Sequence, residues 1–144
     1  MLHRPPELAH IGIGDRTFVN FGAVFLDAAP ITIGSDVQVG PNVQLLTPTH
    51  ELDADRRRAG WERASPVTIG DNVWLGGGVI VCPGVTIGDH TVVGAGAVVT
   101  KDLPTGVLAV GAPRPESSAS CEPPDPLGLR GVGLTPRAPT WRRS

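Results

Sequence analysis

The residue of this chain that is best suited to acid–base chemistry is a histidine at the start of a long polar stretch. His50 opens the run H-E-L-D-A-D-R-R-R-A-G-W-E-R-A-S-P, and three carboxylates follow it closely: Glu51, Asp53 and Asp55. A neighbouring carboxylate can fix the tautomer of an imidazole and raise its basicity, as a general base requires. A lone histidine in a surface loop is more often only solvated, so the residues alone leave both interpretations open.

A metal site finds little support among the histidines. Such a site needs two or three ligands at workable spacing, and no second histidine lies within a few residues of His50 or His90. His3 and His10 precede the regular part of the sequence, and we interpret them, like His90, as incidental. We therefore expect no bound metal.

The elements that must position His50 follow a six-residue period. From Ile69 to Val99 every sixth residue is a large aliphatic, and a small or β-branched residue follows four places after each of the first five. This period fits neither an α-helix nor one alternating strand. It predicts an all-β fold, a parallel β-helix of hexapeptide repeats with two side chains per hexad pointing inward, and with glycine supplying backbone freedom at the corners. The twelve leading positions are Ile13, Val19, Phe25, Ile33, Val39, Leu45, Ile69, Leu75, Val81, Ile87, Val93 and Val99.

Three hexads make one triangular coil, so twelve leading positions predict about four coils. Two extra residues at 30–32 shift the register, and the period stops over 47–66 before it resumes at Val67. The polar insertion over 47–66 should lie on the surface, where such insertions often build a binding face. We expect a lead-in over 1–10, the β-helix over 11–113 and a disordered tail, rich in proline, arginine and serine, over 114–144.

The composition argues against nucleic-acid and membrane partners. Twelve basic and fourteen acidic residues give a net charge of −2, which does not suggest a nucleic-acid partner. No apolar run approaches the length of a membrane span, so we predict a soluble, cytoplasmic protein without a membrane partner. Cys82 is interpreted as a reduced structural thiol. The arginines at 56–58 are interpreted as a solvated face, with a phosphate-bearing ligand as the alternative.

Four stretches of the sequence resemble the maltose/galactoside O-acetyltransferase family, the sugar-acetylating branch of the left-handed β-helix acyltransferases. They are F-V-N-F-G-A-V-F-L-D (18–27), T-H-E-L-D-A-D-R-R-R-A-G-W-E-R-A-S-P (49–66), V-T-I-G-D-N-V-W-L-G-G-G (67–78) and V-G-A-G-A-V-V-T-K-D (93–102). The loop matches in spacing as well as type, with H-x-L-D, R-R, G-x-E and a final proline. That combination is far more specific than hexads alone.

The resemblance implies a left-handed β-helix, a homotrimer, and acetyl-CoA bound in grooves between neighbouring subunits. It implies that His50 takes the proton of an acceptor hydroxyl, with direct transfer of the acetyl group and no acyl-enzyme. Gly77 matches the position whose backbone N–H stabilises the oxyanion, and Asn20 matches a catalytic residue that faces the acceptor. Asp27 matches an acceptor-binding position. The positions that match the family's cofactor contacts are Trp74, Gly77, Ala95, Thr100 and Lys101.

The two ends of the chain depart from the family pattern. We expect no helical N-terminal segment of the kind that helps to close the family's acceptor pocket, so a sugar is only the default acceptor. The family's basic pattern after Gly111-Ala112-Pro113 is replaced by Arg114-Pro115, and we expect the last 31 residues not to be native to the fold. A catalytically silent trimeric scaffold is the alternative, and a trimeric zinc enzyme is a third reading.

Overall fold

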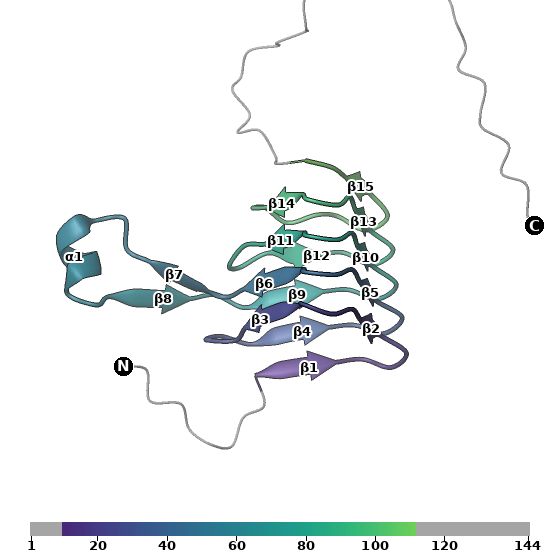
Figure 1. Ribbon diagram of the computed structural model, residues 1–144, viewed down its shortest axis with the longest axis horizontal. Helices are drawn as coiled ribbons and strands as arrows, with labels where there is room; N and C mark the ends of the chain where they lie inside the picture. The colour runs from purple at the N-terminus through teal and green to yellow at the C-terminus, as the bar shows by residue number, and fades with distance from the viewer. Residues whose placement is uncertain (1–9, 112–144) are drawn as a thin grey trace, which may run out of the picture. The chain divides into compact units, whose positions relative to one another are not determined.

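The chain folds as a parallel β-helix, as the six-residue period predicts. The computed structural model describes residues 10–111, and the strands stack into three parallel sheets (Figure 1). Sheet A holds β1 (Ile11–Ile13), β4 (Ile31–Ile33), β9 (Val67–Ile69) and β12 (Thr86–Ile87). Sheet B holds β2 (Phe18–Val19), β5 (Gln38–Val39), β10 (Trp74–Leu75), β13 (Val92–Val93) and β15 (Leu108–Ala109). Sheet C holds β3 (Val24–Leu26), β6 (Gln44–Leu46), β11 (Ile80–Val81) and β14 (Val98–Val99).

The three sheets are the faces of a triangular prism, and the corners between them are named here edge AB, edge BC and edge CA. Coil 1 contains β1 to β3, coil 2 contains β4 to β6, coil 3 contains β9 to β11, and coil 4 contains β12 to β14. The four predicted coils are therefore present. A partial fifth coil, consisting of Leu103 and β15, follows them and was not predicted.

The register of the sheets explains why the fifth coil escaped prediction. Ile69 pairs with Ile87, a regular step of 18 residues, whereas Ile87 pairs with Leu103, a step of 16. The last coil is two residues short, so its aliphatic side chains fall out of phase with the hexads. Ile11 pairs with Ile31, a step of 20, which confirms the two extra residues predicted at 30–32.

The core runs through the prism as two columns of side chains from each sheet. The leading residues of coils 2 to 4, and the residues four places later except Thr49 and Leu103, are at most 4% exposed, which confirms the predicted two inward positions per hexad. Coil 1 is different, because the leading residue Ile13 is 49% exposed at the open end of the stack. The buried residues of the hexads are Ile33, Val37, Val39, Val43, Leu45, Ile69, Val73, Leu75, Val79, Val81, Val85, Ile87, Thr91, Val93, Ala97 and Val99.

The glycines that follow the leading residues have a different role from the one predicted. A Cβ placed on Gly76 would lie 2.5 Å from the backbone nitrogen of Ala95, and one on Gly40 would lie 2.7 Å from that of Gly77. These glycines let one coil approach the next. Backbone freedom is needed two residues later, where Asn72 and Gly78 adopt positive φ values of 52° and 70°. The predicted backbone freedom at the corners is therefore confirmed for glycines such as Gly78 and Gly96, but it does not explain the glycines that directly follow the leading residues.

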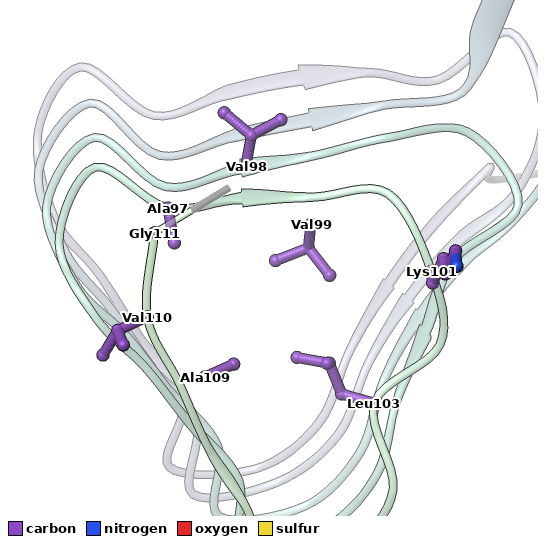
Figure 2. A pocket seen from close by; sticks show the side chains of 8 residues that line it. All are labelled: Ala97, Val98, Val99, Lys101, Leu103, Ala109, Val110 and Gly111. Atoms are coloured by element: carbon purple, nitrogen blue, oxygen red, sulfur yellow. The ribbon is translucent and has the colours of Figure 1, made fainter. Parts of the chain in front are cut away.

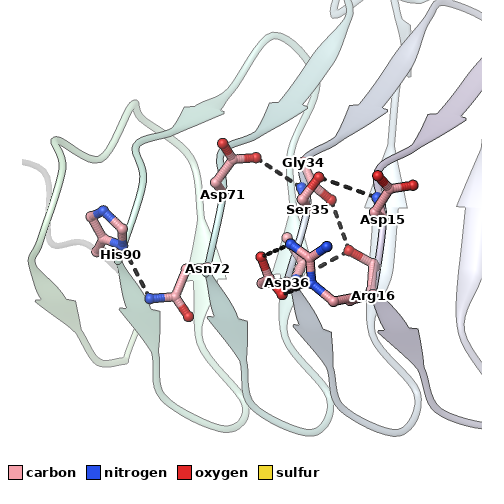
Figure 3. Close-up of polar contacts among 10 residues, drawn as sticks. Asp15, Arg16, Gly34, Ser35, Asp36, Asp71, Asn72 and His90 are labelled. Atoms are coloured by element: carbon pink, nitrogen blue, oxygen red, sulfur yellow. Dashed lines mark hydrogen bonds and ion pairs between the residues drawn. The ribbon is translucent and has the colours of Figure 1, made fainter.

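Edge AB is a structural seam. Side-chain oxygens of one coil accept hydrogen bonds from backbone N–H groups of the preceding coil: Asp15 N–H donates to Ser35 Oγ (3.1 Å) and Ser35 N–H to Asp71 Oδ1 (2.8 Å) (Figure 3). In the same way Asp71 N–H donates to Asp89 Oδ1 (2.8 Å). These bonds satisfy backbone donors that the corners leave outside the strand ladders. They explain the recurring aspartate after isoleucine and glycine.

A second row of side chains follows the same edge. Arg16 donates from Nε and Nη2 to the two carboxylate oxygens of Asp36, both at 2.7 Å, and Asn72 Nδ2 lies 3.0 Å from His90 Nδ1 (Figure 3). The hydrogen bond from Arg16 holds the pKa of Asp36 below its ordinary value, and the same bond raises the pKa of Arg16. His90 thus takes part in a structural contact on edge AB.

The C-terminal end of the prism is open within the described residues. Val99, Leu103 and Ala109 point into the interior and leave a hollow of about 130 Å³, while Val98 points outward (Figure 2). No helix in residues 10–111 is long and apolar enough to cross a membrane. The predicted tail over 114–144, and all but one residue of the predicted lead-in over 1–10, lie outside the described residues.

Candidate functional site

The 47–66 insertion forms a hairpin that projects from edge CA (Figure 1), which confirms its predicted place on the surface. Strand β7 (Pro48–His50) pairs antiparallel with β8 (Glu62–Ala64), and helix α1 (Ala54–Arg58) lies between them. The base of the hairpin is closed by a hydrogen bond from Ser65 N–H to Thr47 C=O (2.9 Å). The coil therefore resumes where it was interrupted.

Thr47 anchors this base to coil 1. Its side chain is fully buried, its hydroxyl donates to Leu26 C=O (2.6 Å), and its Oγ1 accepts from Ala29 N–H (3.0 Å). The hydroxyl supplies a partner to the buried Ala29 N–H, which would be costly to leave unpaired, whereas Leu26 C=O also accepts from Thr47 N–H (3.1 Å). The base of the hairpin is thus rigid, although its tip is fully exposed.

The tip is organised by its own charged residues. Asp53 caps α1 by accepting from the N–H groups of Asp55 (3.1 Å) and Arg56 (2.8 Å), as a preferred N-cap residue does. Arg57 Nη1 donates to the carbonyls of Glu51 (2.9 Å) and Leu52 (3.0 Å). The segment that follows His50 is therefore tied to the short helix.

His50 has a carboxylate partner, and it comes from the opposite strand. His50 pairs with Glu62 in the hairpin register, and His50 Nδ1 lies 3.5 Å from Glu62 Oε1. The carboxylates expected to assist His50 are engaged elsewhere: Glu51 contacts Arg63 Nε at 3.1 Å, while Asp53 and Asp55 serve the helix. Proximity in sequence pointed to the wrong acids, because the hairpin brings residues 50 and 62 together.

The histidine opens onto a pocket. Thr49, His50, Glu51, Leu52 and Arg63 line a depression of about 200 Å³ on the hairpin. The His50 side chain is 63% exposed and that of Glu62 is 47% exposed. The imidazole is accessible to a small molecule, and Glu62 lies on its Nδ1 side, which leaves Nε2 available for proton transfer.

A second group of predicted site residues lies along sheet B and edge BC, and is named here the BC group: Asn20, Trp74, Gly77 and Ala95. Asn20 follows β2, Gly77 follows β10, and Ala95 follows β13, while Trp74 stands on the outer face of sheet B with 56% of its surface exposed. Asn20 Oδ1 accepts from Phe21 N–H (2.9 Å). That bond leaves the amide nitrogen of Asn20 as a hydrogen-bond donor.

The remaining predicted residues accompany His50 on edge CA, and this CA group consists of Asp27, His50, Thr100 and Lys101. Asp27 follows β3, while Thr100 and Lys101 follow β14 and are exposed. One chain does not bring the BC and CA groups together: the hairpin projects on the side away from sheet B (Figure 1). The structure thus divides the predicted site residues into two halves.

Comparison with known proteins shows which family the chain resembles. The family model described as "Bacterial transferase hexapeptide (six repeats)" matches residues 66–101. A putative acetyltransferase of Schizosaccharomyces pombe is 57% identical over 104 residues, which cover 72% of this chain and 50% of that protein. The galactoside O-acetyltransferase of Escherichia coli is 44% identical over 105 residues, which cover 73% of this chain and 52% of the relative. Over about 72% of its length this chain is thus similar to proteins named as acetyltransferases, among them hexapeptide-repeat acetyltransferases of known structure.

Solved structures agree with this family. A maltose O-acetyltransferase from Clostridium difficile aligns with a TM-score of 0.70 at 54% identity, covering 71% of this chain and 55% of that one. A hexapeptide-repeat acetyltransferase from Vibrio cholerae, solved in complex with acetyl coenzyme A, aligns with a TM-score of 0.70 at 48% identity, covering 71% and 56%. The predicted left-handed parallel β-helix is confirmed by this likeness. The chain spans about half the length of the curated relatives it matches.

Glu62 is the site residue that sequence reasoning did not identify as a partner of His50. A signal was present, since Glu62 belongs to the G-x-E part of the family motif in the loop. It becomes informative once the insertion is treated as a hairpin with its turn near α1. In such a hairpin the last residue of β7 must face the first residue of β8.

Proposed function

We propose that this chain transfers the acetyl group of acetyl-CoA to a hydroxyl group of a sugar or similar small acceptor. The observation that carries the proposal is the His50–Glu62 pair, which stands at a pocket on a projecting hairpin. Relatives named galactoside O-acetyltransferase and a neighbour solved with acetyl coenzyme A support the reaction and the donor. The sugar acceptor is inferred from those names.

In the proposed reaction His50 acts as a general base. Its imidazole takes the proton of the acceptor hydroxyl while the oxygen attacks the thioester carbonyl carbon. The C–O bond forms, the C–S bond breaks, and the imidazolium returns the proton to the departing CoA thiolate. Glu62 is a positioning residue that orients the imidazole and stabilises its protonated form. The Gly77 N–H supports the oxyanion, and Asn20 holds the acceptor side.

The division of the site residues into two halves supports a homotrimer with active sites between subunits. The outer face of sheet C is apolar apart from Gln44, whereas the outer face of sheet A carries threonines at 32, 68 and 86. Edges BC and CA border sheet C on either side. Three copies with sheet C turned to a common axis would place edge BC of each subunit beside edge CA of the next. The outward apolar residues of sheet C are Val24, Leu26, Leu46, Ile80 and Val98.

In this arrangement the predicted site residues of two neighbouring subunits would bind the same cofactor and acceptor. Trp74 and Ala95 would contact the pantetheine arm of acetyl-CoA from one subunit. Thr100 and Lys101 would contact the cofactor from the neighbouring subunit, with Lys101 offering a positive charge to a phosphate. Asp27 would lie on the acceptor side beside His50.

Thiol release from acetyl-CoA, measured with and without sugar acceptors, tests the proposed reaction. His50→Ala should lower kcat/KM by about a thousandfold, within the range found for removing a general base. His90→Ala is the matched control, an exposed histidine on edge AB that should leave turnover within about twofold. Glu62→Gln should lower kcat by about tenfold and Glu62→Asp should recover part of it. Turnover that survives His50→Ala would refute the general base.

Mixed trimers test the shared site. Asn20→Ala and His50→Ala disable opposite halves, so each variant alone should be nearly inactive. In randomly mixed trimers about one quarter of the interfaces combine an intact edge BC with an intact edge CA. Equal mixing after unfolding and reassembly should therefore restore about a quarter of wild-type turnover. Absence of any recovery in reassembled trimers would contradict a site divided between subunits.

A further inference from the structure

Asp27, on the acceptor side of the proposed site, lies in an extended corner of the prism. The leading residues on either side of this corner, Phe25 and Ile33, stand eight residues apart instead of six. Residues 27–30 connect β3 to β4 on edge CA. Each additional residue brings two more soft dihedral angles. The direction in which Asp27 projects must therefore be fixed by bonds to the rest of the fold.

The peptide unit before Asp27 is held by Thr47. Leu26 C=O accepts a hydrogen bond from the Thr47 hydroxyl (2.6 Å) and another from the Thr47 N–H (3.1 Å). Thr47 is fully buried at the base of the hairpin that carries His50. The backbone on the N-terminal side of Asp27 is therefore tied to the base of that hairpin.

The peptide unit after Asp27 is held by His10. His10 Nδ1 lies 3.0 Å from Asp27 C=O, and because a carbonyl oxygen can only accept, Nδ1 carries a proton and donates it to this bond. The backbone of His10 is anchored in turn, since its C=O accepts from Ile31 N–H (2.7 Å). The half-buried His10 thus connects the start of β4 with Asp27 across the corner.

These bonds together set the direction of the Asp27 side chain. A peptide unit is planar, so the backbone of a residue has only two soft dihedral angles, φ and ψ. Thr47 holds the plane on one side of the Asp27 Cα and His10 holds the plane on the other, which fixes both angles and with them the Cα–Cβ bond. We infer that His10 is a positioning residue that directs the Asp27 carboxylate toward the acceptor; this inference rests on the proposed function. The sequence does not indicate this role, because His10 precedes the regular repeat.

The kinetics of thiol release with methyl galactoside as acceptor test the inference. His10→Ala removes the donor, so the KM for methyl galactoside should rise about fivefold, while kcat and the KM for acetyl-CoA should stay within about twofold. His10→Asn should keep the wild-type KM, because the amide nitrogen of asparagine is bonded to Cγ, as Nδ1 of histidine is, and can donate at the same place. His10→Gln, whose amide lies one bond farther out, should behave like His10→Ala. His90→Ala, a histidine substitution on edge AB, is the matched control and should change neither KM by more than about twofold.

A double-substitution cycle shows whether His10 acts through Asp27. Asp27→Ala removes the carboxylate and should by itself raise the KM for methyl galactoside by about tenfold or more. Adding His10→Ala to Asp27→Ala should change that KM by less than about twofold, because no carboxylate is left to direct. If His10 only supported the fold, the two effects would multiply.

Several results would overturn the inference and leave the proposed function intact. They are an unchanged KM for methyl galactoside in His10→Ala, an equal rise of the KM for acetyl-CoA, failure of His10→Asn to keep the wild-type KM, and multiplying effects in the cycle. If His10→Ala does not assemble, the KM of His10→Gln relative to that of His10→Asn, expected to be about fivefold higher, decides the question. A wild-type protein that releases no thiol with methyl galactoside or any other sugar would overturn the proposed function and this role of His10 with it.

Discussion

Gly40→Ala should destabilise the prism by forcing two coils apart. A Cβ at residue 40 would lie 2.7 Å from the backbone nitrogen of Gly77, 2.8 Å from Leu75 O and 2.9 Å from Gly76 C. These are backbone atoms, so no side chain can rotate away, and coils 2 and 3 must separate by about 0.7 Å to reach ordinary contact. Overpacking of this kind costs about 1–3 kcal/mol. The separation also strains the hydrogen bonds Gly40 N–H to Leu75 O and Gly78 N–H to Pro41 O, both 2.8 Å, so we expect a loss of about 3 kcal/mol.

Urea unfolding followed by circular dichroism measures this loss, and Gly12→Ala is the control. Gly12 lies in strand β1, and a Cβ there meets nothing within 4 Å, so its substitution should change stability by less than about 1 kcal/mol. The same displacement moves the Gly77 N–H, and a shift near 1 Å at a reacting centre can cost about a hundredfold in rate. If Gly40→Ala, like Gly12→Ala, had the same urea midpoint of unfolding as the wild-type protein, the close-approach explanation of these glycines would be refuted.

Two further substitutions test the seams of the fold. Thr47→Val leaves the buried Ala29 N–H without the threonine hydroxyl, while Leu26 C=O keeps its bond from the residue 47 N–H. Urea unfolding should therefore show a loss of about 1–2 kcal/mol, whereas Thr32→Val on the outer face of sheet A should be nearly neutral. Asp36→Asn should lower the thermal midpoint of unfolding at neutral pH but not at about pH 2. The pKa of Asp36 is depressed in the folded state. The Asp36 carboxylate therefore stabilises the fold above the ordinary carboxylate pKa, and this stabilisation disappears as pH falls through the lowered pKa. Because the pair is exposed, the effect should be small and should shrink in high salt; an equal shift at both pH values would contradict it.

Much of the fold follows from the sequence because the hexad is both a repeat and a packing rule. Residues such as Ile69 and Val73 recur at fixed spacing, and each is nearly fully buried. The fifth coil was missed because it lacks two residues, so its inward residues Leu103 and Ala109 do not continue the period. The role of the glycines was misjudged because a period says which residues share a column and not how closely neighbouring columns approach.

The candidate site was less accessible to sequence reasoning. His50 stood out by type and by its place in the insertion, yet its neighbours in sequence turned out to serve Arg63 and α1. Antiparallel pairing of β7 and β8 brings Glu62 to His50. This pairing could not be predicted from the sequence, because the short insertion lacks the alternating apolar residues that indicate a hairpin. The division into BC and CA groups could not be read from the motif, because a motif gives the order of residues along the chain and not the face of the prism each one occupies.

The repeat itself gives a physical reason why the proposed site would combine a hairpin with a second copy of the chain. In a stack of coils, equivalent side chains of successive coils lie about 4.8 Å apart along each face and edge. The two edges that border sheet C are separated by one hexad, and six extended residues span up to about 20 Å. A general base and an oxyanion donor must both come within about 3 Å of the reacting group, which no two edges of one prism can do. The insertion at Thr47 frees His50 from its column without disturbing the stack, since the Ser65–Thr47 hydrogen bond restores the register. In the proposed trimer the hairpin would extend toward edge BC of a neighbour, so the irregular segment would supply the base and the regular edge would supply the oxyanion donor.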